Sequence, residues 1–267
     1  MGAENRKEAW FTTSWDDGHP SDMHLAELLA KYGLPGTFYI PLENPKRPVM
    51  DRAAIRSLSA AFDIGAHTVH HAEIDRLPDG DAEIEITAPK KVLEDLTGKP
   101  CRMFCFPRGY YKRSQLRFVR DAGFLAARTV ELMSLAFPRM QEGVLVMPTT
   151  MQAYEHSRTN YLKNIGKRKA AVNLLNYLRC KGRNWVETSD WLLREAERKK
   201  GVFHLWGHSW EIDKWGLWQQ LEQVLQKMAE RRDTVRFADN SEVCEYALSH
   251  REAQNPAGTR PLRPLRR

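Results

Sequence analysis

The chain has 267 residues, 42% hydrophobic and 28% charged, which is typical of a folded protein large enough to bury a substantial core. This composition excludes disordered, collagen-like and coiled-coil proteins, and no apolar run approaches the roughly 18 residues of a transmembrane helix. Charges occupy the N-terminus where a signal peptide needs an apolar run, so we expect a cytoplasmic protein. The four cysteines form no CxxC pair and are expected to be free, buried thiols.

The formal net charge of +7 is concentrated in two segments. Residues 251–267 contain five arginines, one glutamate and three prolines, which predicts a disordered basic tail after a single domain over residues 1–250. Residues 158–186 contain eight basic residues and no acidic one. We expect this segment to be helical through apolar positions from Tyr161 to Leu178, with its basic residues on one exposed face. That face is either simply solvated or contacts phosphate or an anionic membrane surface.

Apolar runs alternate with segments of helical periodicity, which predicts β/α units around a mainly parallel sheet. The expected strands cover residues 10–15, 36–40, 63–66, 103–106, 126–130, 144–147, 202–206 and 235–238. The expected helices cover residues 21–32, 52–60, 81–97, 114–122, 160–179, 189–200, 217–231 and 241–249. This α/β order favours a single deformed (β/α) barrel of seven or eight strands. No dinucleotide-binding, P-loop or nucleic-acid-binding motif occurs, so we expect no nucleic acid partner.

Polar clusters follow four of these strands, at the end of a barrel where functional residues gather. They are Ser14-Trp15-Asp16-Asp17-Gly18-His19, Gly65-Ala66-His67-Thr68-Val69-His70-His71, Cys105-Phe106-Pro107-Arg108-Gly109-Tyr110-Tyr111 and His204-Leu205-Trp206-Gly207-His208-Ser209-Trp210-Glu211.

Two of the clusters suggest metal chemistry. His67 and His71 are four residues apart, the spacing at which two imidazoles on one side of a helical turn can bind one ion. Asp16 and Asp17 are adjacent carboxylates, whose repulsion a cation or a proton relay would compensate. Turn-forming aspartates and structural histidines are the alternative interpretations when each cluster is considered alone.

Together the clusters resemble the polysaccharide deacetylase family, carbohydrate esterase family four, whose shared barrel is the NodB homology domain. The resemblance extends from about Phe11 to about Asp239. Ser14-Trp15-Asp16-Asp17-Gly18 is similar to the family's Thr-Phe-Asp-Asp-Gly motif, and His67-Thr68-Val69-His70-His71 matches its His-Ser/Thr-x-x-His motif. The third motif, Arg-x-Pro-Tyr-Gly, is only partly kept, because Cys105 stands in place of the arginine and Arg108 in place of the tyrosine.

The resemblance implies specific roles for these residues. Asp17, His67 and His71 would hold one divalent ion, with zinc preferred by the mixed nitrogen and oxygen ligands. Asp16 would be the general base, and His208, preferred to His204, the general acid. The third motif implies that Arg108 supplies a backbone N–H to an oxyanion hole. A weak candidate for the fourth motif is Asp190-Trp191.

The implied function is metal-dependent removal of an N-acetyl group from a sugar or a polysaccharide or glycolipid precursor, with release of acetate. Tyr110, Trp206 and Trp210 are candidates to stack on a sugar ring. An expected cytoplasmic location favours a nucleotide- or lipid-linked sugar, whose phosphates would suit the basic segment. The altered third motif leaves two alternatives: a hydrolase of another C–N bond, such as that of a cyclic imide or ureide, and an inactive carbohydrate-binding barrel.

Overall fold

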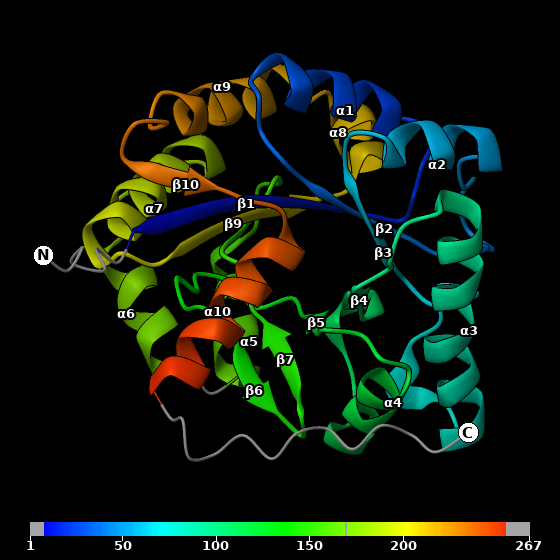
Figure 1. Cartoon of the computed structure of the whole chain (residues 1–267). Helices are drawn as coiled ribbons and strands as arrows, with labels where there is room; N and C mark the ends of the chain where they lie inside the picture. The colour runs from blue at the N-terminus through cyan, green and yellow to red at the C-terminus, as the bar shows by residue number, and fades with distance from the viewer. Residues whose placement is uncertain (1–7, 169, 255–267) are drawn as a thin grey trace, which may run out of the picture.

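Strand β1 (Ala9–Asp16) lies near the middle of a curled sheet, and all eight of its residues are buried (Figure 1). This computed structural model describes residues 8–168 and 170–254. Along the central path the strand order is β6-β7-β5-β4-β3-β2-β1-β9-β8, and β10 pairs with the start of β1. The other strands are β2 (Thr37–Ile40), β3 (Asp63–Ala66), β4 (Met103–Cys105), β5 (Ala126–Arg128), β6 (Arg139–Gln141), β7 (Val144–Met147), β8 (Met151–Gln152), β9 (Val202–Gly207) and β10 (Val235–Phe237).

The strand pairs are parallel except for the antiparallel pair of β6 and β7. The predicted deformed α/β barrel is therefore confirmed as a curled sheet, and the described strands pair without closing it into a ring. Each of the eight predicted strands overlaps an observed one. The additional strands, β6 and β8, have three and two residues.

Helices cover the outer side of the sheet, and one helix crosses its inner side near the start of β1 (Figure 1). The helices are α1 (Asp22–Lys31), α2 (Arg52–Ser59), α3 (Asp79–Thr97), α4 (Leu116–Asp121), α5 (Arg158–Arg168), α6 (Ala171–Arg179), α7 (Trp185–Lys199), α8 (Ser209–Trp215), α9 (Trp218–Ala229) and α10 (Asn240–Gln254), with short 3-10 turns η1 (Ile74–Arg76), η2 (Pro107–Gly109) and η3 (Arg113–Gln115). No described helix is long and apolar enough to cross a bilayer.

Side chains alternate between the two sides of each strand, so the sheet has one buried layer on its outer side and another on its inner side. In β1, Phe11 and Trp15 point toward the helices and join the larger core, whereas Trp10 points to the inner side, where it packs in a cluster with Val243 of α10. Further along the same inner side, Ser14 and Asp16 bring polar groups to the carboxyl end of the strand. The apolar packing at the amino end of β1 thus supports the polar groups at its carboxyl end.

Several predictions about segments need correction. Residues 160–179 form two helices rather than one, and Val172, Leu175 and Leu178, expected on the inner face of that helix, are exposed. Helix α10 continues to Gln254, so the predicted domain boundary at residue 250 lies within a helix, and residues 255–267 of the predicted tail lie outside the described residues. The four cysteines are free, as predicted, although Cys180 is only partly buried.

Candidate active site

All four sequence clusters contribute residues to one cavity of about 600 Å³ at the carboxyl ends of the parallel strands. Its lining comprises Asp16, Asp17, Lys46, Arg47, His67, His71, Ala72, Glu73, Arg76, Leu77, Arg108, Val130, Gln152, Trp206, His208, Trp210 and Glu211. Carboxylates, imidazoles and indoles from loops far apart in the sequence therefore share one enclosure.

Asp17, His67 and His71 form the tightest cluster in this cavity. One ligand atom from each lies within 4.8 Å of the other two. Asp17 Oδ1 is 2.9 Å from His71 Nε2 and 3.7 Å from His67 Nε2, yet this buried oxygen has no hydrogen-bond partner of acceptable geometry among the described residues. His67 Nδ1 lies 2.9 Å from the carbonyl oxygen of Cys105. Donation to that oxygen fixes the proton on Nδ1 and leaves the Nε2 lone pair directed at Asp17.

The ionisation of these groups suits cation binding. Burial would raise the pKa of Asp17, but its contact with His71 and the charges of His208 and His67 hold that pKa well below its usual value. Burial lowers the pKa of His67 to about 4, despite the opposing charges of Asp16 and Asp17. The carboxylate is therefore ionised and the His67 imidazole neutral near pH 7, which are the forms that bind metals.

The backbone around this cluster is held in an uncommon conformation. Asp17, Thr68, His71 and Arg108 have φ values of 79°, 69°, 52° and 56°, in the left-handed region that non-glycine residues rarely adopt. Trp210 Nε1 donates a hydrogen bond of 2.8 Å to Asp17 Oδ2, which fixes the orientation of the carboxylate. Such strain persists where the surrounding structure imposes it, and it is concentrated here in the loops that carry the candidate residues.

Asp16 is held by an arginine that the sequence motif does not contain. Arg128 Nη2 donates to Asp16 Oδ1, and both residues are buried. Arg128 stands on β5 directly opposite Cys105 on β4, and its guanidinium lies 5.0 Å from the ring centres of both Tyr39 and Trp206. The neighbouring strand thus supplies the cation that the motif lacks at Cys105.

The His208 side chain lines the cavity and contacts a carboxylate. Its Nδ1 is 2.7 Å from Glu211 Oε2, and Gln152 Nε2 donates to the same oxygen at 2.8 Å. Burial would lower the pKa of His208, but the hydrogen bond to Glu211 and the charge of Asp17 raise it to about 9. His208 is therefore a protonated donor near pH 7.

His204 occupies a different environment. It is fully buried, its Nε2 is 2.8 Å from Ser14 Oγ, and its Nδ1 is 3.1 Å from the Pro148 carbonyl oxygen. Burial and the charge of Arg128 lower its pKa to about 3. His204 does not line the cavity, so its position fits a structural histidine.

The candidate sugar-binding residues are divided between two places. Trp206, Trp210 and Arg108 line the cavity, and Arg108 Nη1 also forms an ion pair of 3.0 Å with Glu73. Tyr110 lines a neighbouring pocket instead, where Lys167 Nζ lies 3.5 Å from its ring centre. The structure therefore does not bring Tyr110 to the metal-type cluster.

The fourth-motif candidate also lies elsewhere. Asp190 is on α7, where it forms ion pairs with Arg194 and Arg231, and it does not line the cavity.

The carboxylate that contacts His208 belongs to Glu211. The sequence contained one signal for it: its position three residues after His208, the i, i+3 spacing at which helical side chains meet.

A second group of possible ligands overlaps the first. Asp16, His67 and Cys105 also have atoms within 4.8 Å of one another. Burial raises the pKa of the Cys105 thiol well above its usual value, and Asp16 is already paired with Arg128. A protonated thiol is a poor ligand, so Asp17 is the better partner for His67.

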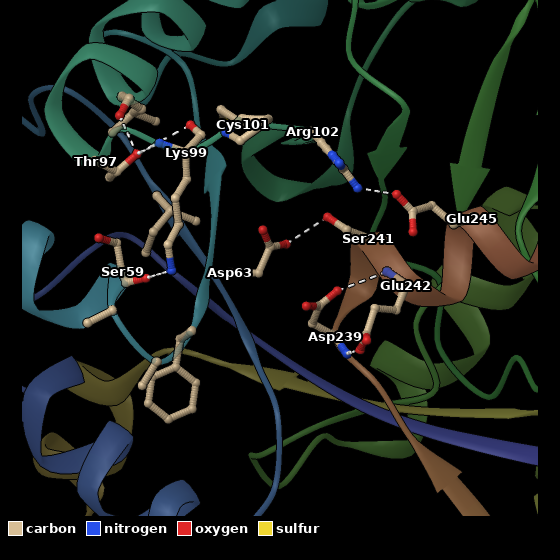
Figure 2. A pocket seen from close by; sticks show the side chains of 16 residues that line it. Ser59, Asp63, Thr97, Lys99, Cys101, Arg102, Asp239, Ser241, Glu242 and Glu245 are labelled. Carbon is tan, nitrogen blue, oxygen red and sulfur yellow. Dashed lines mark hydrogen bonds and ion pairs between the residues drawn. The ribbon is translucent and has the colours of Figure 1, made fainter.

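Another pocket lies at the opposite ends of the strands (Figure 2). Asp63 at the start of β3 accepts a hydrogen bond of 2.9 Å from Ser241, and Arg102 forms an ion pair with Glu245. Figure 2 shows these polar groups directed at one another. Their mutual pairing and their distance along β3 from His67 favour a structural role at the base of the sheet.

Comparison with known proteins agrees with this geometry. The model of the polysaccharide deacetylase family matches residues 3–127. A search of curated proteins gives no match. Among solved structures, a Mycobacterium smegmatis protein assigned as a polysaccharide deacetylase has 15% identity and a TM-score of 0.69, with 94% of each chain covered.

Two further structures share the fold. Puue allantoinase has 12% identity and a TM-score of 0.65, covering 94% of this chain and 93% of its own. The chitin deacetylase of Colletotrichum lindemuthianum has 11% identity and a TM-score of 0.58, covering 89% and 88%. Residues 3–127, which carry Asp16, Asp17, His67 and His71, thus match the model of the polysaccharide deacetylase family.

Proposed function

We propose that this protein is a metal-dependent hydrolase that removes the N-acetyl group from an N-acetylated sugar and releases acetate. The observation that carries this proposal is the convergence of three potential ligands, Asp17, His67 and His71, beside the buried Asp16 carboxylate and the protonated His208. Such a site contains a candidate base, a candidate acid and a place for a Lewis acid within one cavity.

The three ligands fit a divalent ion. Two imidazoles and one carboxylate are typical of catalytic zinc sites, and the unpartnered Oδ1 of Asp17 is the kind of buried oxygen that a cation satisfies. A bound divalent ion would polarise the acetyl carbonyl and lower the pKa of a water molecule.

The other residues act on the substrate and its protons. Asp16, oriented by Arg128, accepts a proton from the attacking water. His208 donates a proton to the nitrogen of the sugar as the C–N bond breaks, and Glu211 keeps His208 protonated until then. Arg108, at its positive φ, offers its backbone N–H to the developing oxyanion, while Trp206 and Trp210 pack against the sugar ring.

Four basic residues in the cavity lining favour a phosphate-bearing substrate. These are Lys46, Arg47, Arg76 and Arg108. Arg76 and Arg108 share Glu73 as an ion-pair partner, and Arg47 lies 3.5 Å from the ring centre of Trp210. A nucleotide- or lipid-linked N-acetyl sugar would place negative charge near this rim.

Metal content and acetate release, measured together, test the proposal. The substrates are nucleotide-linked N-acetyl sugars, N-acetylhexosamine oligomers and cyclic ureides, the last included because one structural neighbour is an allantoinase. We expect about one divalent ion per wild-type chain. His67→Ala/His71→Ala should lose both the ion and activity. His70→Ala is the matched control, because His70 belongs to the same motif but pairs with Glu85 at 2.6 Å, away from Asp17.

The outcomes separate the alternatives. Bound ion with turnover of ureides alone would replace the deacetylase by a hydrolase of another C–N bond. Sugar binding without turnover, unaffected by metal removal, would indicate an inactive binding barrel. The missing arginine at Cys105 favours that last alternative, whereas the pairing of Arg128 with Asp16 favours an active site.

A further inference from the structure

Helix α6 has the reverse of the usual polarity of a surface helix. Its buried residues are Asn173 and Asn176, whereas Val172, Leu175 and Leu178 are 66%, 50% and 68% exposed. A surface helix normally turns its apolar stripe toward the core and its polar side toward water. The outward leucines therefore require a separate explanation.

The orientation of α6 is fixed by hydrogen bonds on its inner side. Asn173 Nδ2 donates to the Leu132 carbonyl oxygen at 2.9 Å, and Asn176 Nδ2 donates to the Met133 carbonyl oxygen at 2.8 Å. Lys199 Nζ donates to Asn176 Oδ1 at 2.7 Å. Turning the helix over would leave these buried carbonyl groups without partners, which is costly. The exposed leucines are thus a consequence of specific contacts.

Positive charge surrounds this apolar stripe. Leu162 of α5 is 48% exposed, and the exposed basic residues in the described part of the segment are Arg158, Lys163, Lys167, Arg179, Lys181 and Arg183. Residues 158–186 contain no acidic side chain, and within the described part of the chain none of these six cations forms an ion pair with a carboxylate. We call α5, α6 and this basic border the α5–α6 surface. Figure 1 shows α6 at the left edge of the molecule.

This combination indicates what the surface binds. Exposed aliphatic side chains bordered by lysine and arginine are typical of helices that lie in the interface of an anionic membrane. Nucleic acid would use the cations but not the leucines. A second copy of the chain would bring the same positive charge against it, which disfavours self-association.

The surface is attached to the catalytic loops. Arg168, at the end of α5, donates to the carbonyl oxygens of Gly109 at 2.6 Å and Val130 at 3.2 Å. Val130 and Arg108 line the active-site cavity. A bilayer in contact with α5 and α6 would therefore lie near one side of the site.

We propose that the α5–α6 surface docks this protein onto anionic lipid bilayers, with the leucines of α6 inserted among the lipids and the surrounding cations on the headgroups. The proposal concerns binding alone and does not depend on the proposed activity. If both hold, the substrate is presented at a membrane.

Vesicle co-sedimentation of the full chain tests the docking. The vesicles are phosphatidylcholine alone and phosphatidylcholine mixed with phosphatidylglycerol. We expect binding to the anionic vesicles only. Leu175→Ser/Leu178→Ser and Lys163→Glu/Lys181→Glu should each weaken this binding by on the order of tenfold or more. Ile84→Ser is the matched control, because Ile84 is an aliphatic residue 62% exposed on α3, and it should leave binding unchanged.

Three results would overturn the proposal. Equal sedimentation with and without anionic lipid would exclude charge-directed docking. Full binding by the leucine variant would show that the leucines do not insert and that the vesicles are bound by charge attraction alone. A change in oligomeric state of that variant without lipid, together with unchanged vesicle binding, would assign the leucines to a second copy of the chain. Far-UV circular dichroism and thermal denaturation check that each variant is folded, independently of any activity.

Discussion

At the scale of single residues, Arg128 shows how a cation distant in the sequence can balance a buried carboxylate. A buried carboxylate such as Asp16 requires a cation or several donors. Arg128 can reach it because β4 and β5 are parallel neighbours in which Cys105 and Arg128 are paired. A linear motif cannot reveal that Arg128 lies beside position 105, because the two positions are 23 residues apart in sequence and adjacent only through the strand register.

The register predicts that an arginine at position 105 can replace Arg128 as the partner of Asp16. Arg128→Cys should lower kcat on the order of 100-fold or more and destabilise the fold by about 3–5 kcal/mol, because it leaves a buried carboxylate unpaired. Cys105→Arg/Arg128→Cys should recover part of both losses. Steady-state kinetics and urea denaturation measure the two effects, with Arg113→Met, which removes an exposed ion pair with Glu142, as the control. A double variant no better than Arg128→Cys would contradict the pairing.

Glu211 influences the pKa of His208, and this influence can be measured. His208 must be protonated to act as an acid, so activity should decline as the pH rises through about 9. Glu211→Gln removes the largest influence that raises this pKa, and the basic limb of the pH–rate profile should move toward neutral pH. Glu73→Gln changes another carboxylate of the same cavity and should leave the limb in place. An unmoved limb in Glu211→Gln would separate His208 from proton donation.

At the scale of elements, periodicity predicted most of the fold. All eight expected strands exist, and the clearest of them, such as β1 and β9, are buried runs followed by a helix signal. Strand β8 has two residues and carries no periodicity to detect. Helix α8 was not predicted because it begins immediately after His208 and lasts only seven residues, which resembles a loop in sequence.

The segment containing α5 and α6 shows where periodicity misleads. Leucine spacing in residues 160–179 favours one continuous helix with the leucines inside. The orientation of α6 is instead fixed by Asn173 and Asn176, whose side chains donate hydrogen bonds to the backbone carbonyl groups of residues 132 and 133. Hydrophobic pattern cannot anticipate a helix whose packing is governed by hydrogen bonds to a distant loop.

At the scale of the whole molecule, the proposed ion would link folding to metal binding. Asp17 follows β1, and His67 and His71 follow β3, so one ion would join two loops that β2 separates in the sheet. The unfolded chain does not hold these ligands together. An ion bound only by the native state therefore stabilises it by mass action.

This coupling predicts a thermal shift. At about 100 times its Kd, zinc should stabilise the wild-type protein by about 2.7 kcal/mol, which corresponds to a rise in Tm of roughly 5–10 °C for a chain of this size. Differential scanning calorimetry with zinc and with a chelator measures the rise. It should be kept in His70→Ala and lost in Asp17→Asn, because only the latter removes the negative charge of a potential ligand. An equal rise in Asp17→Asn would place the ion elsewhere, with the acidic groups of the pocket in Figure 2 the first alternative to examine.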